Sequence, residues 1–241
     1  MIDTQVVILA GGLGTRLDLV DIPKPMYKLS GKPILEHNIL LLKKYNVKDI
    51  CIALHYLPEV IKQYFGNGKD WRVNIQYSVE DKPMGTSGAI KNAEWFFNKE
   101  SLLVLYGDNY VDINLKEMLD FHKTKKPLAT VALFDPKKSL NSGIAGGVIS
   151  IDEDNNLLSF TEGKGNKING YVNAGVYILE HEILNMIPPN IPSDFGKDIF
   201  PKLLKEKHLI MGYITSGFVL AIDTKDALKV TEQALNKNDN D

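Results

Sequence analysis

The sequence predicts an α/β fold in which a mostly parallel sheet is covered by helices on both faces. Through the first half of the chain, short apolar runs rich in branched residues alternate with longer amphipathic stretches, as expected for strand–helix–strand units. Most of these runs are apolar throughout, which is typical of strands buried on both faces of a parallel sheet. The 241 residues, 44% of them apolar, are enough to bury a substantial single core.

Each element of the first half has its own signal. The strand 6–10 ends at two glycines, and Pro33 opens the first helix because proline suits the first turn of a helix. The run 73–77 alternates apolar and polar residues, as a half-buried strand does. The predicted strands are 6–10, 50–54, 73–77, 102–106 and 128–134, and the predicted helices are 33–45, 58–65, 88–97 and 115–122.

The second half of the chain is less regular. Its proline-rich segment 188–192 marks a turn-rich break. No shift in composition, flexible linker or internal repeat separates the two halves, so we expect one domain built of two lobes. The predicted strands are 148–151, 157–161, 171–179, 208–214 and 218–222, and the predicted helices are 195–205 and 225–235.

Composition and charge exclude several classes of protein. The 28 Lys and Arg residues nearly balance the 30 Asp and Glu residues, for a net charge of −2, so nothing marks the chain as a binder of nucleic acid or of an acidic membrane. The single cysteine, Cys51, lies in an apolar run and cannot form an intramolecular disulfide. No apolar stretch approaches the roughly 18 residues that cross a bilayer, and no signal peptide is indicated. We therefore expect a cytoplasmic protein.

The strongest motif follows the first strand, where ligands of such sheets bind. It reads LAGGLGTRL from Leu9 to Leu17. A P-loop would end in Gly-Lys-Ser/Thr, and a dinucleotide-binding fingerprint would place a glycine at Leu17, so both are excluded. Three glycines let backbone N–H groups approach phosphate oxygens, and Arg16 adds a charged, planar fork. The alternative interpretation is a tight turn with a solvated arginine.

Three charged residues are candidates for binding phosphate or metal. Lys24 lies between two prolines, so its ammonium could be fixed on an α-phosphate, or it could be an exposed lysine in a turn. Asp108 and Asp223 each follow a buried strand, at the edge of the sheet where Mg²⁺ could bridge protein and phosphates. Asp223 could equally be the N-cap of the last helix.

The segment 80–88 lies between a predicted strand and a predicted helix. Its glycines and hydroxyls could present donors and acceptors to the edge of a base, or it could be an ordinary entry to a helix with Thr86 or Ser87 as the cap. Catalysis by a serine or by a histidine-bound metal is not indicated. The five histidines lack metal-ligand spacing, and no serine lies in a Gly-x-Ser-x-Gly elbow.

Eight segments, in order along nearly the whole chain, resemble the sugar-1-phosphate nucleotidyltransferases. They are LAGGLGTRL, PKPM, SGKPILEH, EDKPMGTSGAI, GDN, NAGVYIL, DFGKDIFPKL and AIDT. The branch that the chain resembles most is the mannose- and D-glycero-D-manno-heptose-1-phosphate guanylyltransferases. The resemblance implies a Rossmann-like three-layer α/β/α fold, with a mainly nucleotide-binding lobe (1–135), a mainly sugar-binding lobe (136–222) and a closing helix and polar tail (223–241).

The resemblance also implies a reaction and a set of site residues. An NTP, with GTP favoured, and a sugar 1-phosphate would give an NDP-sugar and pyrophosphate, with Mg²⁺ as cofactor. The implied residues are Arg16, Lys24 and Asp108 for catalysis; Leu9, Gly11, Gly12, Gly14, Thr15, Arg16, Glu80, Gly85 and Thr86 for the nucleotide; Gly147, Glu162, Lys164 and Asn173 for the sugar; and Asp108 and Asp223 for the metal.

One segment departs from the family pattern. Many relatives carry Glu-Lys-Pro on the sugar side, whereas this chain keeps Glu162, displaces the lysine to Lys164 and lacks the proline. Lys164, Lys167 or Lys197 could contact the sugar phosphate. Three alternatives stay open: transfer of a uridylyl, cytidylyl or thymidylyl group to another phosphorylated substrate, a non-catalytic nucleotide-sugar sensor, and a nicotinamide-dependent dehydrogenase, which Leu17 argues against.

Overall fold

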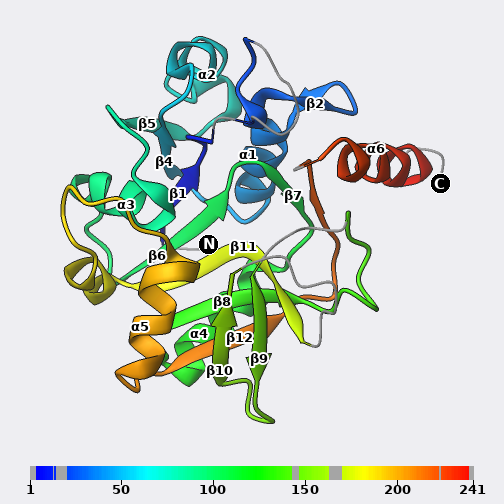
Figure 1. Cartoon of the computed structure of the whole chain (residues 1–241). Coiled ribbons are helices and arrows are strands. Elements are labelled where there is room, and N and C mark those ends of the chain that lie inside the picture. The colour runs from blue at the N-terminus through cyan, green and yellow to red at the C-terminus, as the bar shows by residue number, and fades with distance from the viewer. Residues whose placement is uncertain are drawn as a thin grey trace.

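The fold is built on one mixed sheet, shown in Figure 1. The computed structural model describes residues 4–12, 14, 21–142, 147–162, 170–222 and 224–238. Within these residues the sheet has nine strands in the order β10-β9-β11-β6-β1-β4-β5, with β8 pairing β11 and β12 pairing β8. Their bounds are β1 (Gln5–Leu9), β4 (Asp49–Leu54), β5 (Asn74–Val79), β6 (Ser101–Tyr106), β8 (Ala129–Phe134), β9 (Val148–Ile151), β10 (Leu157–Thr161), β11 (Tyr171–Glu180) and β12 (Ile210–Ile214).

Strand direction divides the sheet into two parts. Strands β5, β4, β1 and β6 are parallel neighbours, so their carboxyl ends meet at one edge. Strand β11 runs antiparallel to β6, β8 and β9 and joins the irregular second half to the parallel half. The sheet therefore continues through both halves of the chain.

Helices cover both faces of the sheet, which confirms the predicted α/β class. The helices α1 (Ile34–Lys44), α2 (Pro58–Phe65) and α4 (Leu115–Lys125) pack into the apolar cluster on one face. The helices α3 (Gly85–Asn92) and α5 (Phe200–Lys205) pack into the cluster on the other. Because successive strand residues point to opposite faces, Val6 and Ile8 lie in the first cluster and Val7 lies in the second.

Short elements lie around this framework; the sequence predicted the strand 219–221, within its strand 218–222, and included 94–96 in its helix 88–97, but did not predict the others. They are the strand pairs β2 (Lys28–Leu29) with β3 (Lys32–Pro33) and β7 (Asn109–Val111) with β13 (Val219–Ala221), and the 3-10 turns Lys24–Met26, Lys69–Trp71, Glu94–Phe96 and His181–Met186. The last helix, α6 (Lys225–Asn238), packs through Leu228 and Leu235 against Leu29 and Ile222. None of the helices in the described part of the chain is long and apolar enough to cross a membrane.

Two predicted helices differ in the structure. Helix α3 begins at Gly85, three residues before the predicted start at residue 88, and ends at Asn92. The predicted helix 195–205 is a π-helical turn, Phe195–Ile199, followed by α5. The two segments contact each other, since Ser87 N and Gly88 N both donate to Ser193 O at 3.1 Å.

The alternative in which Thr86 or Ser87 caps α3 is wrong. Thr86 and Ser87 lie inside the first turn of the helix, and the N-cap residue Met84 makes no side-chain cap hydrogen bond. The free N–H groups of this turn are bound instead by Ser193 O and by Asp194 Oδ1, which accepts from Thr86 N at 3.0 Å. A segment more than 100 residues away therefore caps the helix.

The stability of the protein is expected to fall as the pH drops below about 6.5, because of a buried histidine. His122 is 2% exposed, and its ring bonds Thr130 Oγ1 at 2.7 Å and Glu180 Oε1 at 2.8 Å. Burial lowers the pKa of His122, although Glu180 opposes the shift. The unfolded chain therefore binds a proton at a higher pH than the folded protein, and folding free energy is lost as the pH falls through the unfolded value toward the folded one.

Urea unfolding at pH 7.5 and pH 5.5 measures this effect. The loss of stability between the two pH values should be smaller in His122→Gln than in the wild type. His208→Gln is the matched control, because His208 is partly exposed beside Glu206. An equal pH dependence in wild type and His122→Gln would show that this histidine does not contribute.

Candidate functional site

A cavity of about 370 Å³ opens at the carboxyl ends of the parallel strands. Leu9 ends β1, Ala53 lies at the end of β4, and Tyr106 ends β6, and all three line the cavity. The predicted edge of the sheet is therefore the edge that carries the cavity. Nine predicted site residues line it: Leu9, Gly11, Gly12, Gly14, Lys24, Glu80, Gly85, Thr86 and Asp108.

The glycine segment after β1 forms one wall of this cavity. Ala10 N donates to Ala53 O at 2.8 Å, which ties the start of the segment to β4. Gly12 has open space where a Cβ would be, so a ligand can approach its backbone closely. The predicted residues Thr15 and Arg16 lie outside the described residues.

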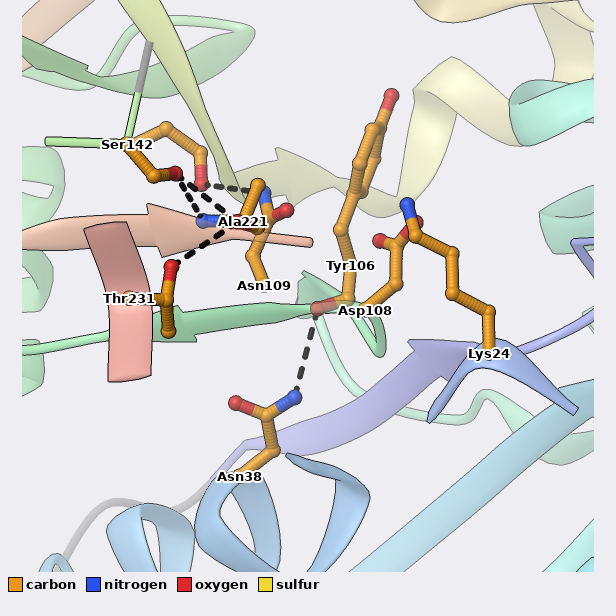
Figure 2. Close-up of polar contacts among 9 residues, drawn as sticks. Lys24, Asn38, Tyr106, Asp108, Asn109, Ser142, Ala221 and Thr231 are labelled. Atoms are coloured by element: carbon orange, nitrogen blue, oxygen red, sulfur yellow. Dashed lines mark hydrogen bonds and ion pairs between the residues drawn. The ribbon is translucent and has the colours of Figure 1, made fainter. Parts of the chain in front are cut away.

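Lys24 and Asp108 form an ion pair at the cavity, as Figure 2 shows. Lys24 Nζ donates to Asp108 Oδ2 at 2.5 Å. The lysine lies in the 3-10 turn Lys24–Met26, which is held by a hydrogen bond from Met26 N to Pro23 O at 2.8 Å. Lys24 is only 6% exposed, so the alternative of an exposed lysine in a proline turn is wrong. A buried ammonium is held here beside a carboxylate, facing the space where an anion could bind.

The segment after Asp108 is clamped to the end of β13. Asn109 opens β7 and pairs with Ala221 of β13. Both polar groups of Ala221 are bound by side chains, since its N–H donates to Ser142 Oγ at 2.7 Å and its carbonyl accepts from Thr231 Oγ1 at 3.1 Å. Figure 2 shows this clamp beside the Lys24–Asp108 pair. The predicted metal ligand Asp223, two residues further along the chain, lies outside the described residues.

Glu80 has one carboxylate oxygen without a partner. Its Oε2 accepts from Met84 N at 3.1 Å, whereas the buried Oε1 has no hydrogen-bond partner in the part of the chain that the structure describes. Burial raises the pKa of Glu80, although Met84 N and His55 oppose the shift. An unpaired buried acceptor is costly, and this one belongs to a residue that lines the cavity. It suits a donor N–H on a ligand.

The sequence missed Tyr106 and Asp194 as cavity residues. Asp194 reaches the cavity because its segment packs on the start of α3. Gly85 allows this approach, since a Cβ there would lie 2.4 Å from Ser193 O and its φ is +72°. The pair Gly85 and Asp194 is distant in sequence, and no spacing rule predicts it.

The predicted sugar-side residues lie beyond the cavity lining. Asn173 N donates to Gly147 O at 3.1 Å, which places these two residues side by side. Glu162 follows β10 and lies against Gly196, where a Cβ would meet its Oε1 at 2.2 Å. Burial raises the pKa of Glu162, with Lys197 opposing the shift and Asp194 adding to it. Lys164 lies outside the described residues, as does Lys167.

No group of three or more metal-ligating side chains occurs among the described residues. Asp108 is the predicted metal ligand that the structure describes, and its carboxylate lines the cavity with a side chain 28% exposed. Mg²⁺ is commonly held by one or two carboxylates together with substrate phosphates and waters. One partly exposed carboxylate that lines the cavity fits that pattern.

The fold is an α/β sheet with a cavity at the carboxyl ends of its parallel strands, and comparison with known proteins identifies the family. The family model described as Nucleotidyl transferase matches residues 5–221, so the chain belongs to this family.

Among the relatives are two D-glycero-alpha-D-manno-heptose 1-phosphate guanylyltransferases. The protein of Campylobacter jejuni is 40% identical over 183 residues, which cover 75% of this chain and 78% of that protein. The protein of Aneurinibacillus thermoaerophilus is 30% identical over 233 residues, covering 96% of this chain and 98% of that protein. The crystal structure of HddC from Yersinia pseudotuberculosis complexed with GMP-PN superposes with a TM-score of 0.81 at 30% identity, covering 96% of this chain and 99% of that one.

Proposed function

We propose that this enzyme transfers a nucleoside monophosphate from an NTP to a sugar 1-phosphate and releases pyrophosphate. GTP is the favoured nucleotide, and a mannose- or manno-heptose-type sugar 1-phosphate is the favoured acceptor. The observation that carries the proposal is the convergence of nine predicted site residues, from four separate segments, on one cavity. The names of the relatives and the nucleotide in the HddC complex support the choice of substrates.

Neutralising charge is the main task of such a site, because both reactants are anions. The buried ammonium of Lys24 lies at the cavity and is suited to bind the α-phosphate, and Arg16 is suited to bind the pyrophosphate that leaves. Holding the two reactants in line would supply a large further part of the rate enhancement. A phosphate monoester is already a competent nucleophile at neutral pH, so the site requires no general base.

Asp108 and Asp223 are the residues that would hold Mg²⁺ in this proposal. The bound cation would supply charge neutralisation at the phosphates. In the structure Asp108 is paired with Lys24 at 2.5 Å. Binding of nucleotide and metal would exchange this pair, with Lys24 moving to phosphate and Asp108 releasing its hydrogen bond to the lysine.

Glu80 is proposed to read the base through its unpaired Oε1. Guanine offers N1–H and an amino group to such an acceptor, uracil and thymine offer N3–H, and cytosine offers an amino group. The relatives' names favour guanine among these. On the sugar side, Gly147, Glu162 and Asn173 are proposed to bind hydroxyls, and Lys164 or Lys197 to bind the sugar phosphate.

A matrix of pyrophosphate-release assays tests the proposed function. Each of GTP, ATP, UTP, CTP and dTTP is combined with mannose, manno-heptose and glucose 1-phosphates in the presence of Mg²⁺. We expect the highest rate with GTP and a manno-configured acceptor. A folded protein that releases no pyrophosphate with any pair would overturn the proposal. Tight binding of an NDP-sugar without turnover would instead indicate a nucleotide-sugar sensor.

Glu80→Gln is expected to change the preference among nucleotides. The amide keeps the size of the side chain but presents one donor and one acceptor in place of two acceptors. The ratio of kcat/KM for GTP to that for UTP should fall by about tenfold, the scale of one buried hydrogen bond to a charged group. Glu117→Gln, on the exposed face of α4, is the matched control. An unchanged ratio would show that Glu80 does not read the base.

A further inference from the structure

A chain of hydrogen-bonded side chains links the cavity wall to the predicted sugar-side residue Asn173. Asn173 Nδ2 donates to Tyr177 Oη at 2.6 Å, and Tyr177 Oη donates to Tyr106 Oη at 3.0 Å. The Tyr106 hydroxyl also bonds the side chain of Thr86, and both Tyr106 and Thr86 line the cavity. One chain of contacts therefore runs from a residue predicted to bind sugar to a residue predicted to bind nucleotide.

The direction of this chain is fixed at its start. Gly175 N donates to Asn173 Oδ1 at 3.0 Å, so the other end of the Asn173 amide must be the NH₂ group that faces Tyr177. A phenol has one proton, and Tyr177 gives its proton to Tyr106.

Thr86 continues the chain of hydrogen bonds toward Asp194. Thr86 Oγ1 accepts from Phe195 N at 2.9 Å and donates to Asp194 Oδ1 at 3.3 Å. The contacts therefore run from Asn173 through Tyr177, Tyr106 and Thr86 to the carboxylate of Asp194, which also lines the cavity.

Packing holds the two rings in place. Tyr106 and Tyr177 meet edge to face, with ring centroids 5.7 Å apart, and Phe195 and Phe200 pack on Tyr177 at 5.5 and 5.3 Å. A Cβ at Gly175 would lie 2.9 Å from Tyr106 Cγ, so the backbone of β11 touches the ring directly. Burial raises the pKa of both tyrosines, so both are neutral and able to donate at pH 7.

We propose that Tyr106 is a positioning residue that sets where the acceptor sugar 1-phosphate lies relative to the nucleotide. The proposal rests on the proposed function. It assigns the positioning role of Tyr106 to the hydroxyl rather than to the ring. Tyr106 ends the strand that precedes Asp108, and Figure 2 shows its ring beside the Asp108 carboxylate. Its hydroxyl ties the sugar-side strand β11 to the start of α3. Without that hydroxyl, Asn173 and Asp194 would no longer be held by one chain of contacts.

Tyr106→Phe tests the proposal, because it removes the hydroxyl and keeps the ring. We expect KM for the sugar 1-phosphate to rise about tenfold, the scale of one buried hydrogen bond, while KM for the NTP stays within about twofold. Tyr177→Phe breaks the preceding link and should raise the same KM. Tyr213→Phe is the control. Tyr213 lies on β12, away from the cavity, and its hydroxyl donates to Glu117 Oε2 at 3.2 Å. Removing this hydroxyl should change neither KM.

A purely structural role predicts a different result. A variant with a lower melting temperature but an unchanged KM for the sugar 1-phosphate, or with both KM values raised equally, would overturn the proposal. Binding of a non-hydrolysable GTP analogue, measured by calorimetry, gives a second readout that Tyr106→Phe should leave unchanged. An active wild type with an unaffected Tyr106→Phe variant would overturn this inference alone, whereas an inactive wild type would overturn the proposed function as well.

Discussion

Asp108→Asn is expected to lower kcat by about 10³-fold, on the scale of losing one charge that acts in the transition state. The amide keeps the size and shape of the side chain but removes the negative charge that would hold the cation. Binding of GTP measured without Mg²⁺ should change far less than turnover, because the metal is then absent from both proteins. Steady-state pyrophosphate release and calorimetry in EDTA provide the two measurements.

Asp120→Asn is the matched control for this variant. Asp120 pairs with Lys116 at 2.6 Å on the exposed face of α4, so the same chemical change is made outside the cavity and should not alter kcat. Because Asp108→Asn removes one charged partner of the buried Lys24, some loss of stability is also expected. The double variant Lys24→Met with Asp108→Asn should regain stability and stay inactive. Wild-type turnover in Asp108→Asn would exclude the metal assignment.

Lys24→Ala is expected to slow the chemical step by about 10²–10³-fold, on the scale of losing one contact to developing charge. The lysine is 6% exposed, and its ammonium is already held at the cavity by Asp108. Water therefore screens little of the charge of the Lys24 ammonium, and solvent cannot easily take its place in the variant. Single-turnover measurements with saturating NTP and sugar 1-phosphate separate this effect from changes in binding.

Lys116→Ala is the matched control for the lysine variant. Lys116 forms a lysine–aspartate pair like that of Lys24, but its side chain is exposed to solvent, and its removal should leave the single-turnover rate unchanged. A near-wild-type single-turnover rate in Lys24→Ala would show that the ammonium does not act on the reacting phosphate.

The sequence predicted most elements of the parallel half accurately, with α3 the exception. Helix α2 has the predicted bounds Pro58–Phe65, and β6 extends the predicted strand 102–106 by one residue. These elements were predictable because a continuously buried strand and an amphipathic helix each require a characteristic spacing of apolar and polar residues along the chain. The edge that carries the cavity was equally predictable, because parallel strands bring their carboxyl ends together.

The candidate site was predictable where its residues follow those strands directly. Gly11, Gly12 and Asp108 all lie within the loops that the sequence singled out, and the structure brings them to one cavity. The choice between a buried and an exposed Lys24 was not predictable. This lysine is buried beside Asp108, which lies 84 residues away in the sequence.

The sequence by itself determined the α/β class, the order of its strands and helices, and the edge of the sheet that carries the candidate site. Only the tertiary structure decided that Asp194 caps α3, that Glu80 keeps one unpaired oxygen, and that Tyr106 and Tyr177 connect the two sides of the site. The physical reason is the separation in sequence between the residues that interact. Periodicity and turn chemistry act between near neighbours, whereas these contacts join segments that meet only after the sheet has formed.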